Sequence, residues 1–154
     1  MIFDNLDDFI KTVRIKPDYK LASLDIGGKK IGTALWSSFL NLVTPGKVIY
    51  RSHLDKDLDL LKAFIKENSI NGLVLGLPLQ MDAKEGTQCQ SIRKFATAIE
   101  EAFNIPMIFQ DERLTTAFAN KLTKDMGHSR KKGNQVDDSI AALLILESFI
   151  KKLN

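Results

Sequence analysis

The stretch LASLDIGGKKIGTAL, residues 21–35, decides how this chain folds, because an apolar run ends in a tight glycine turn. The Gly27-Gly28 pair between two apolar segments predicts a β-hairpin. Asp25 lies at the tip of the first strand. Aspartate is a common turn residue, so Asp25 alone could simply stabilise the turn. A carboxylate there also suits phosphate binding by the turn or metal binding by the acid, and these two functions belong to different classes of protein.

After the hairpin, strand patterns alternate with helix patterns. We expect strands over residues 20–26, 30–37, 47–51, 73–77 and 105–109, and helices over residues 5–15, 58–65, 92–103, 115–126 and 137–152. The polar segment GHSRKKGNQ, residues 127–135, predicts a loop. Three strands in hairpin succession, followed by strands that come after helices, predict an α/β fold with a mixed five-stranded sheet flanked by helices.

The composition fits one globular domain, because 154 residues with 44% hydrophobic residues can bury a substantial core. No apolar run approaches the roughly 18 residues that a membrane span needs. The acidic N-terminal stretch MIFDNLDDFIK is unlike a secretory signal, and the single cysteine, Cys89, excludes an internal disulfide. We therefore expect a cytoplasmic protein with no membrane partner. The net charge of +3 permits a nucleic-acid partner without requiring one.

Acidic residues occur at the ends of predicted strands and at the start of the last predicted helix. Asp25 ends the first strand, Asp111-Glu112 follows the last strand, and Asp137-Asp138 opens the final helix. Three such elements can meet at one edge of a sheet, and a cluster of carboxylates suits Mg²⁺ or Mn²⁺. Successive strand residues face opposite sides, so only one of Asp111 and Glu112 is expected in the site. One of Asp137 and Asp138 could be only the helix N-cap.

The final helix contains small residues that would let it approach the sheet closely. Ala142 lies four positions after Asp138, on the same helical face, and Ala141 is its neighbour. A close approach would bring Asp138 towards the end of the first strand. Alanine is also an ordinary helix former, so the pair does not by itself establish this packing.

Basic residues accompany the acids along the chain. They are Lys29 and Lys30 in the glycine turn, Arg113 directly after the acid pair, and Arg130, Lys131 and Lys132 in the predicted polar loop. Basic loops near carboxylates suit a phosphodiester substrate, because cations contact phosphates while metal ions do the chemistry. Arg113 could instead pair with whichever acid of Asp111 and Glu112 faces away from the site. Solvated loops are commonly charged, so each basic residue alone is weak evidence.

Four segments in a fixed order carry a family resemblance: LDIGGKKIGTAL, LVLGLPLQMDAKEG, DERLTT and DSIAALLILESF. Together they resemble the YqgF/RuvX family of Holliday-junction-resolvase-like proteins, whose members are also described as nucleases of precursor 16S ribosomal RNA. The resemblance extends from about residue 21 to the C-terminus. It implies an RNase H-like fold and a bacterial cytoplasmic nuclease that acts in the maturation of the 5′ end of 16S rRNA.

The same resemblance implies which residues form the site. The first-strand acid is Asp25, the acid of the last strand is Asp111 or Glu112, and the helix acid is Asp138. Residues 1–18 lie outside the shared core and are expected to form an N-terminal helical extension, with residues 19–154 as the RNase H-like nuclease domain.

Three other functions remain as alternatives. A Holliday-junction resolvase would cut branched DNA with the same acids, and a ribosome-assembly or transcription-associated module would bind nucleic acid with little catalysis. Actin-like ATPases and sugar kinases share the glycine turn, but they need two domains around the nucleotide and this chain accommodates one. Phosphodiester cleavage with Mg²⁺ or Mn²⁺ distinguishes the nucleases from the binding module, and nucleotide binding tests the ATPase.

Overall fold

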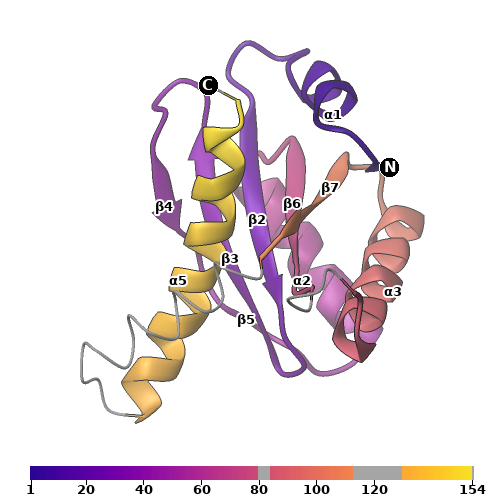
Figure 1. The fold of residues 1–154 in the computed structure, drawn as a ribbon, viewed down its shortest axis with the longest axis vertical. Helices are drawn as coiled ribbons and strands as arrows, with labels where there is room; N and C mark the ends of the chain where they lie inside the picture. Colours follow the sequence, from indigo (N-terminus) through magenta and orange to yellow (C-terminus); the bar gives the residue numbers. More distant parts are fainter. Residues whose placement is uncertain (80–83, 113–129, 154) are drawn as a thin grey trace.

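The computed structural model describes residues 1–79, 84–112 and 130–153, and for residues 130–139 it describes the course of the backbone only. The helices are α1 (Leu6–Val13), α2 (Leu54–Glu67), α3 (Thr87–Ala102) and α5 (Arg130–Lys151), and the strands are β1 (Ile2–Phe3), β2 (Lys20–Ile26), β3 (Lys30–Ser37), β4 (Val43–Pro45), β5 (Ile49–Tyr50), β6 (Gly72–Leu77) and β7 (Met107–Asp111). Figure 1 shows α5 across one face of the sheet, with α2 and α3 on the other.

The hairpin at the start of the domain forms as predicted. β2 and β3 are antiparallel with Asp25 opposite Gly32, and the N–H of Gly27 donates to the carbonyl oxygen of Lys30 at 2.9 Å. β4 and β5 both extend the sheet beyond β3. The strand predicted over residues 47–51 is therefore shorter than expected, and β4 adds a segment that the sequence pattern did not reveal.

β6 and β7 are parallel to β2, as the alternation of helices and strands predicts. The sheet order is β1-β7-β6-β2-β3-β4, with β5 paired to β3. The mixed α/β fold class is thus confirmed. The described residues contribute seven strands rather than the expected five, because β1 and β4 are segments of two and three residues that carry no periodic pattern.

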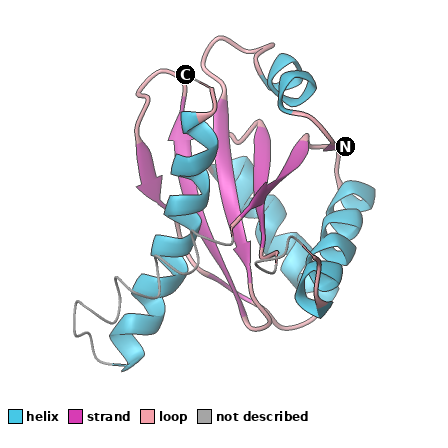
Figure 2. Cartoon of the chain, in the orientation of Figure 1, coloured by secondary structure: helices cyan, strands magenta, loops and turns pink. Residues whose placement is uncertain are grey.

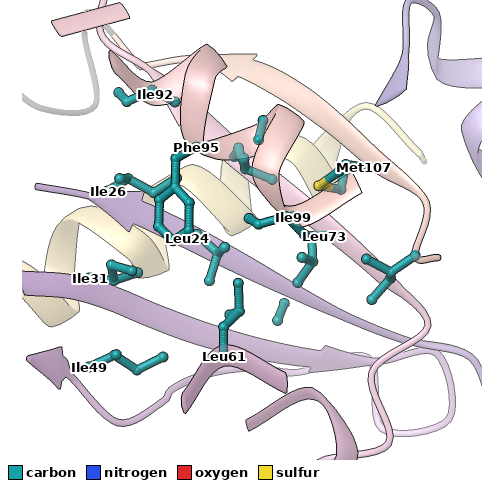
Figure 3. Close-up of a cluster of buried hydrophobic side chains, with 14 of the residues drawn as sticks. Leu24, Ile26, Ile31, Ile49, Leu61, Leu73, Ile92, Phe95, Ile99 and Met107 are labelled. Carbon is teal, nitrogen blue, oxygen red and sulfur yellow. The ribbon is translucent and has the colours of Figure 1, made fainter. Parts of the chain in front are cut away.

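The two faces of the sheet bury different cores. Alternate residues of β2 point to opposite sides, so Leu24 contributes to the core under α2 and α3, whereas Leu21 contributes to the core under α5 and α1. Figure 3 shows the first of these cores, where Phe95 of α3 and Leu61 of α2 meet the strands. This alternation decides on which face each strand-end acid lies.

The N-terminal helix forms within the predicted range and packs on the α5 side of the sheet. Asn5 caps α1 by accepting a hydrogen bond from the N–H of Asp8 at 2.9 Å. Phe9 is fully buried and its ring lies edge-on to Phe149 of α5, with centroids 5.7 Å apart. The division of the chain at residue 18 into an extension and a nuclease domain stays a prediction.

The last helix is longer than predicted. α5 begins at Arg130, so the interpretation of residues 130–135 as a loop was wrong, and Asp137 and Asp138 lie well inside the helix rather than at its start. Lysine, arginine and glutamine are good helix formers, and they outweigh Gly133 in this segment. Figure 2 shows the extended helix. The helix predicted over residues 115–126 and the start of the predicted loop lie outside the described residues.

No helix in the described part of the chain is long and apolar enough to cross a membrane.

Candidate active site

Asp25 lies near the C-terminal end of β2, on the face that α5 covers. Ser23, two residues earlier on the same face, is fully buried and donates a hydrogen bond from its Oγ to the carbonyl oxygen of Ala142 at 2.6 Å. Asp25 itself is half-buried. The hairpin ladder pairs Asp25 with Gly32, and the parallel ladder with β6 holds β2 up to the preceding residue, Leu24, so the carboxylate of Asp25 projects from a rigid element.

Glu112 and Asp111 lie on opposite faces. Asp111 pairs in register with Leu77, whose side chain is buried under α3, and Asp111 is exposed. Glu112 directly follows β7 and is only 3% exposed. Its N–H donates to the carbonyl oxygen of Leu77 at 3.2 Å, which fixes the backbone just past the end of the strand. Of this pair, Glu112 therefore shares a face with Asp25.

The absence of a side chain at Gly76 leaves room for the carboxyl group of Glu112. A Cβ atom at residue 76 would lie 2.9 Å from Oε2 of Glu112 and 2.5 Å from Cδ1 of Ile145 in α5. The carboxyl group therefore lies over β6, between the sheet and α5. Leu24 pairs with Leu75, so Asp25 and Gly76 are lateral neighbours on strands about 4.8 Å apart. Glu112 follows β7, which β6 separates from β2, and its carboxyl group lies over β6, the strand next to the one that carries Asp25.

The backbone of α5 brings Asp138 to the same region. Figure 1 shows α5 running antiparallel to β2, so residues before Ala142 lie towards the C-terminal end of that strand. Asp138 is four residues, about 6 Å along the helix axis, before Ala142. Asp25 is two strand residues, about 6.6 Å, beyond Ser23, the hydrogen-bond partner of Ala142. The predicted convergence of three chain elements is therefore consistent with the backbone geometry.

The donor atoms available here fit a hard divalent cation. Asp25 and Glu112 offer only carboxylate oxygens, which are the ligands that Mg²⁺ and Mn²⁺ prefer. Among the described residues no group of three potential metal ligands is close enough to hold an ion. The expected third ligand, Asp138, belongs to the segment described by its backbone alone.

The predicted basic residues are placed differently from one another. Lys29 is exposed in the turn after Asp25, and the Lys30 Nζ lies 6.0 Å from the centroid of the Tyr50 ring. Arg130, Lys131 and Lys132 form the first turn of α5 rather than a loop. Arg113 lies outside the described residues. The interpretation of residues 130–132 as a basic loop is therefore wrong, although their position at one end of α5 keeps them on the chain segment that carries Asp138.

Sequence reasoning missed an arginine that holds the glycine turn. The Arg51 side chain donates from Nη1 to the carbonyl oxygen of Gly27 at 2.7 Å and from Nε to Oδ2 of Asp57 at 3.1 Å. Asp57 is 2% exposed and also accepts from the N–H of Ser52 at 2.9 Å. The guanidinium stacks on Phe95 at 4.7 Å from the ring centroid. No sequence pattern indicated this set, because its members come from four separate segments.

Two further polar groups, on the α3 side of the sheet, are structural. Burial raises the pKa of the Cys89 thiol, whose Sγ donates to the carbonyl oxygen of Pro78 at 3.3 Å, so this cysteine packs rather than reacts. Hydrogen bonds from Arg93 lower the pKa of Glu85, at 2.6 and 2.8 Å. This ion pair is exposed and lies on the α3 side of the sheet.

The sheet order and the helices on its two faces define an RNase H-like fold of the resolvase type. The crystal structure of the yeast mitochondrial Holliday junction resolvase is similar, with a TM-score of 0.54 at 9% identity, covering 96% of this chain and 86% of that one. The family model described as RuvX, Holliday junction resolvase, matches residues 19–152. This chain belongs to the RuvX family.

Relatives in sequence extend over the whole chain. A Wolbachia pipientis protein named "Putative pre-16S rRNA nuclease" is 34% identical over 154 residues, which is 100% of this chain and 98% of that protein. A protein of the same name from Paramagnetospirillum magneticum is 38% identical over 133 residues, 86% of each chain. The resemblance inferred from the four sequence segments is confirmed.

Proposed function

We propose that this protein is a metal-dependent endonuclease that processes the 5′ end of precursor 16S rRNA, in the cytoplasm where that precursor is made. One observation carries the proposal: Asp25 and the buried Glu112 share one face of the sheet, and the Glu112 carboxyl group lies over Gly76 of β6, the strand next to that of Asp25. Two like charges so close are stable only with a cation or a retained proton. The names of full-length relatives supply the RNA substrate class.

In this proposal Asp25, Glu112 and Asp138 hold Mg²⁺ or Mn²⁺. When bound, such ions activate a water molecule and stabilise the leaving oxygen of a phosphodiester. The protein holds the carboxylates on two strand ends and one helix, so they need no rearrangement when the substrate arrives. The burial of Glu112 keeps bulk water away from one side of the site, which strengthens electrostatic interactions there. Lys29, exposed in the next turn, is positioned to contact a backbone phosphate.

The direct test is cleavage of a precursor RNA fragment, with the 5′ end mapped by primer extension. Asp25→Asn keeps the size of the side chain and removes its charge, so we expect cleavage to fall by more than the roughly 10- to 100-fold that loss of an outer metal partner costs. Asp111→Asn is the matched control, because Asp111 is exposed on the opposite face. Thermal melting checks folding. Wild-type cleavage by a well-folded Asp25→Asn protein would contradict the proposal.

Branched DNA is a second candidate substrate. The similarity of the fold to a Holliday junction resolvase and the description of the family favour this candidate. A four-way DNA junction is therefore included beside the precursor RNA in the same time course. Cleavage of the junction alone would reassign the substrate while keeping the acids in their roles. Cleavage of neither substrate, by a protein that binds both, would favour the non-catalytic binding module.

A further inference from the structure

A hollow lies at the end of the sheet, on the opposite face from the acids. It has a volume of about 290 Å³, and its lining consists of Ile26, Gly27, Gly28, Arg51, Thr87, Gln88, Ser91 and Ile92. A water molecule occupies about 30 Å³ in the liquid, so a phosphate group of five heavy atoms fits easily. We propose that this hollow binds a backbone phosphate of the nucleic acid, a few nucleotides from the bond that is cut.

The charged group of the hollow is Arg51, and it is fixed before any ligand arrives. Its side chain is 20% exposed. Nε and Nη1 are engaged with Asp57 and Gly27, and Phe95 supports the plane of the guanidinium. Nη2 donates no hydrogen bond to any residue that the structure describes. A guanidinium held in this way loses little conformational freedom on binding, and its geometry matches phosphate oxygens.

The remaining lining suits an anion. Among the residues that the structure describes, no carboxylate lines the hollow, and its uncharged polar side chains are the hydroxyl groups of Thr87 and Ser91 and the amide of Gln88, which can all donate hydrogen bonds. Asp57, the acid bonded to Arg51, is buried and does not line the hollow. Within the described part of the chain, a phosphate in the hollow therefore meets hydrogen-bond donors and no carboxylate of the lining.

The distance from the candidate active site suits a continuous strand. Gly27 and Gly28 follow Asp25 by two and three residues, so the hollow begins within about 10 Å of that acid. Each nucleotide of a strand advances by about 3.4 Å along the helix axis. This inference rests on the proposed function, because it takes the acids as the place of cleavage. The phosphate contact in the hollow fixes the position of the substrate strand relative to the acids.

The test compares two exposed glutamines of α3. Gln88 lines the hollow, and Gln90 lies two residues further on and does not. Gln88→Glu places a negative charge at the hollow, and Gln90→Glu places the same charge on the same helical turn. RNA affinity is measured with Ca²⁺ over a range of salt concentrations. We expect Gln88→Glu to weaken binding about tenfold and to lower the salt slope by about 0.7, the value for one phosphate of a single strand. We expect Gln90→Glu to behave as the wild type.

A second variant tests the anchor itself. Arg51→Lys keeps a cation beside Asp57 but removes the planar group that faces the hollow, so we expect a similar loss of affinity. Its melting temperature is measured in parallel. Equal affinity and equal salt slope for Gln88→Glu and Gln90→Glu would overturn the inference, as would unchanged affinity in a folded Arg51→Lys protein. Neither result bears on the cleavage assay with Asp25→Asn, so the proposed function is tested separately.

Free nucleotides offer the same phosphate chemistry, and a further arm of the experiment distinguishes them. ATP binding is measured for the wild type and for Gln88→Glu. We expect millimolar or weaker ATP binding and a clear effect of the substitution on RNA. If Gln88→Glu weakened the binding of ATP and left that of RNA unchanged, the hollow would be a nucleotide site and the inference would be wrong.

Discussion

The carboxyl group of Glu112 occupies the space that a side chain at Gly76 would need. A Cβ atom there would lie 2.9 Å from Oε2 and 3.0 Å from Cδ of Glu112. The conformation of Glu112 therefore requires a glycine at position 76 of β6. The side chain of Ile145 in α5 packs over the same position. Any change at residue 76 acts on the acid and on the helix contact together.

Gly76→Ala is expected to impair cleavage more than stability. The methyl group must displace the ends of two side chains, Glu112 and Ile145, and such overpacking costs about 1–3 kcal/mol of unfolding free energy. The same displacement moves the Glu112 carboxyl group away from Asp25. Chemical denaturation measures the first effect and precursor RNA cleavage the second. Gly28→Ala is the control for stability, because a Cβ atom there has no neighbour within 4 Å. Equal effects of the two substitutions on the unfolding free energy would contradict this account.

Glu112→Gln should separate activity from stability. The substitution keeps the shape of a side chain that is 3% exposed and removes a buried negative charge. Burial of an ionised carboxylate carries a desolvation cost that a neutral amide of the same shape largely avoids. We therefore expect cleavage to collapse while the melting temperature holds or rises. The increase in melting temperature that Mg²⁺ gives the wild type, through binding to the folded state, should disappear. Asp111→Asn should keep both the activity and the response to Mg²⁺, and a loss of either would count against this assignment.

The hairpin and the acids at the strand ends could be predicted from sequence because their signals are local. The Gly27-Gly28 pair between two apolar runs is compatible with few structures other than a β-hairpin. The choice between Asp111 and Glu112 could not be made, because β7 ends at Asp111 and the phase of alternation past a strand end depends on tertiary contacts. Here the contact over Gly76 shows on which side Glu112 lies.

The errors also have physical causes. The start of α5 was placed too late, because its first turns contain Arg130, Lys131 and Lys132, and a polar helix end shows no apolar periodicity. Arg51 was missed because its partners, Gly27 and Asp57, become neighbours only when β2, β5 and α2 have packed. Short strands such as β1 depend on an existing edge, here that of β7.

Ser23 controls how closely α5 approaches the acids. Its Oγ, fully buried, donates to the Ala142 carbonyl oxygen at 2.6 Å. Ser23→Ala removes one hydrogen bond and leaves room, so we expect a loss of about 1 kcal/mol and nearly normal cleavage. Ser23→Val adds bulk between β2 and α5, so we expect a loss of about 1–3 kcal/mol and a larger fall in cleavage. Equal cleavage by two folded variants would show that the helix position does not matter.

The helical geometry of α5 distinguishes the two acids of its second and third turns. Ala142, Ile145, Leu146 and Phe149 are nearly or fully buried and mark the face that packs on the sheet. With about 100° per residue, Asp138 lies about 40° from the direction of Ala142, whereas Asp137 lies about 140° from it. We therefore expect Asp138 on the packed face, towards the end of β2, and Asp137 on the far side.

Asp138→Asn and Asp137→Asn thus form a matched pair in one helix. Each removes one negative charge and keeps the side-chain size, and both have the same effect on the net charge of the protein. We expect Asp138→Asn to abolish cleavage and the stabilisation by Mg²⁺, because the third carboxylate is lost. We expect Asp137→Asn to retain both within about twofold. The measurements are the precursor RNA time course and melting with and without Mg²⁺. If Asp137→Asn were the inactive variant, α5 would have to be rotated from the orientation that its buried residues define.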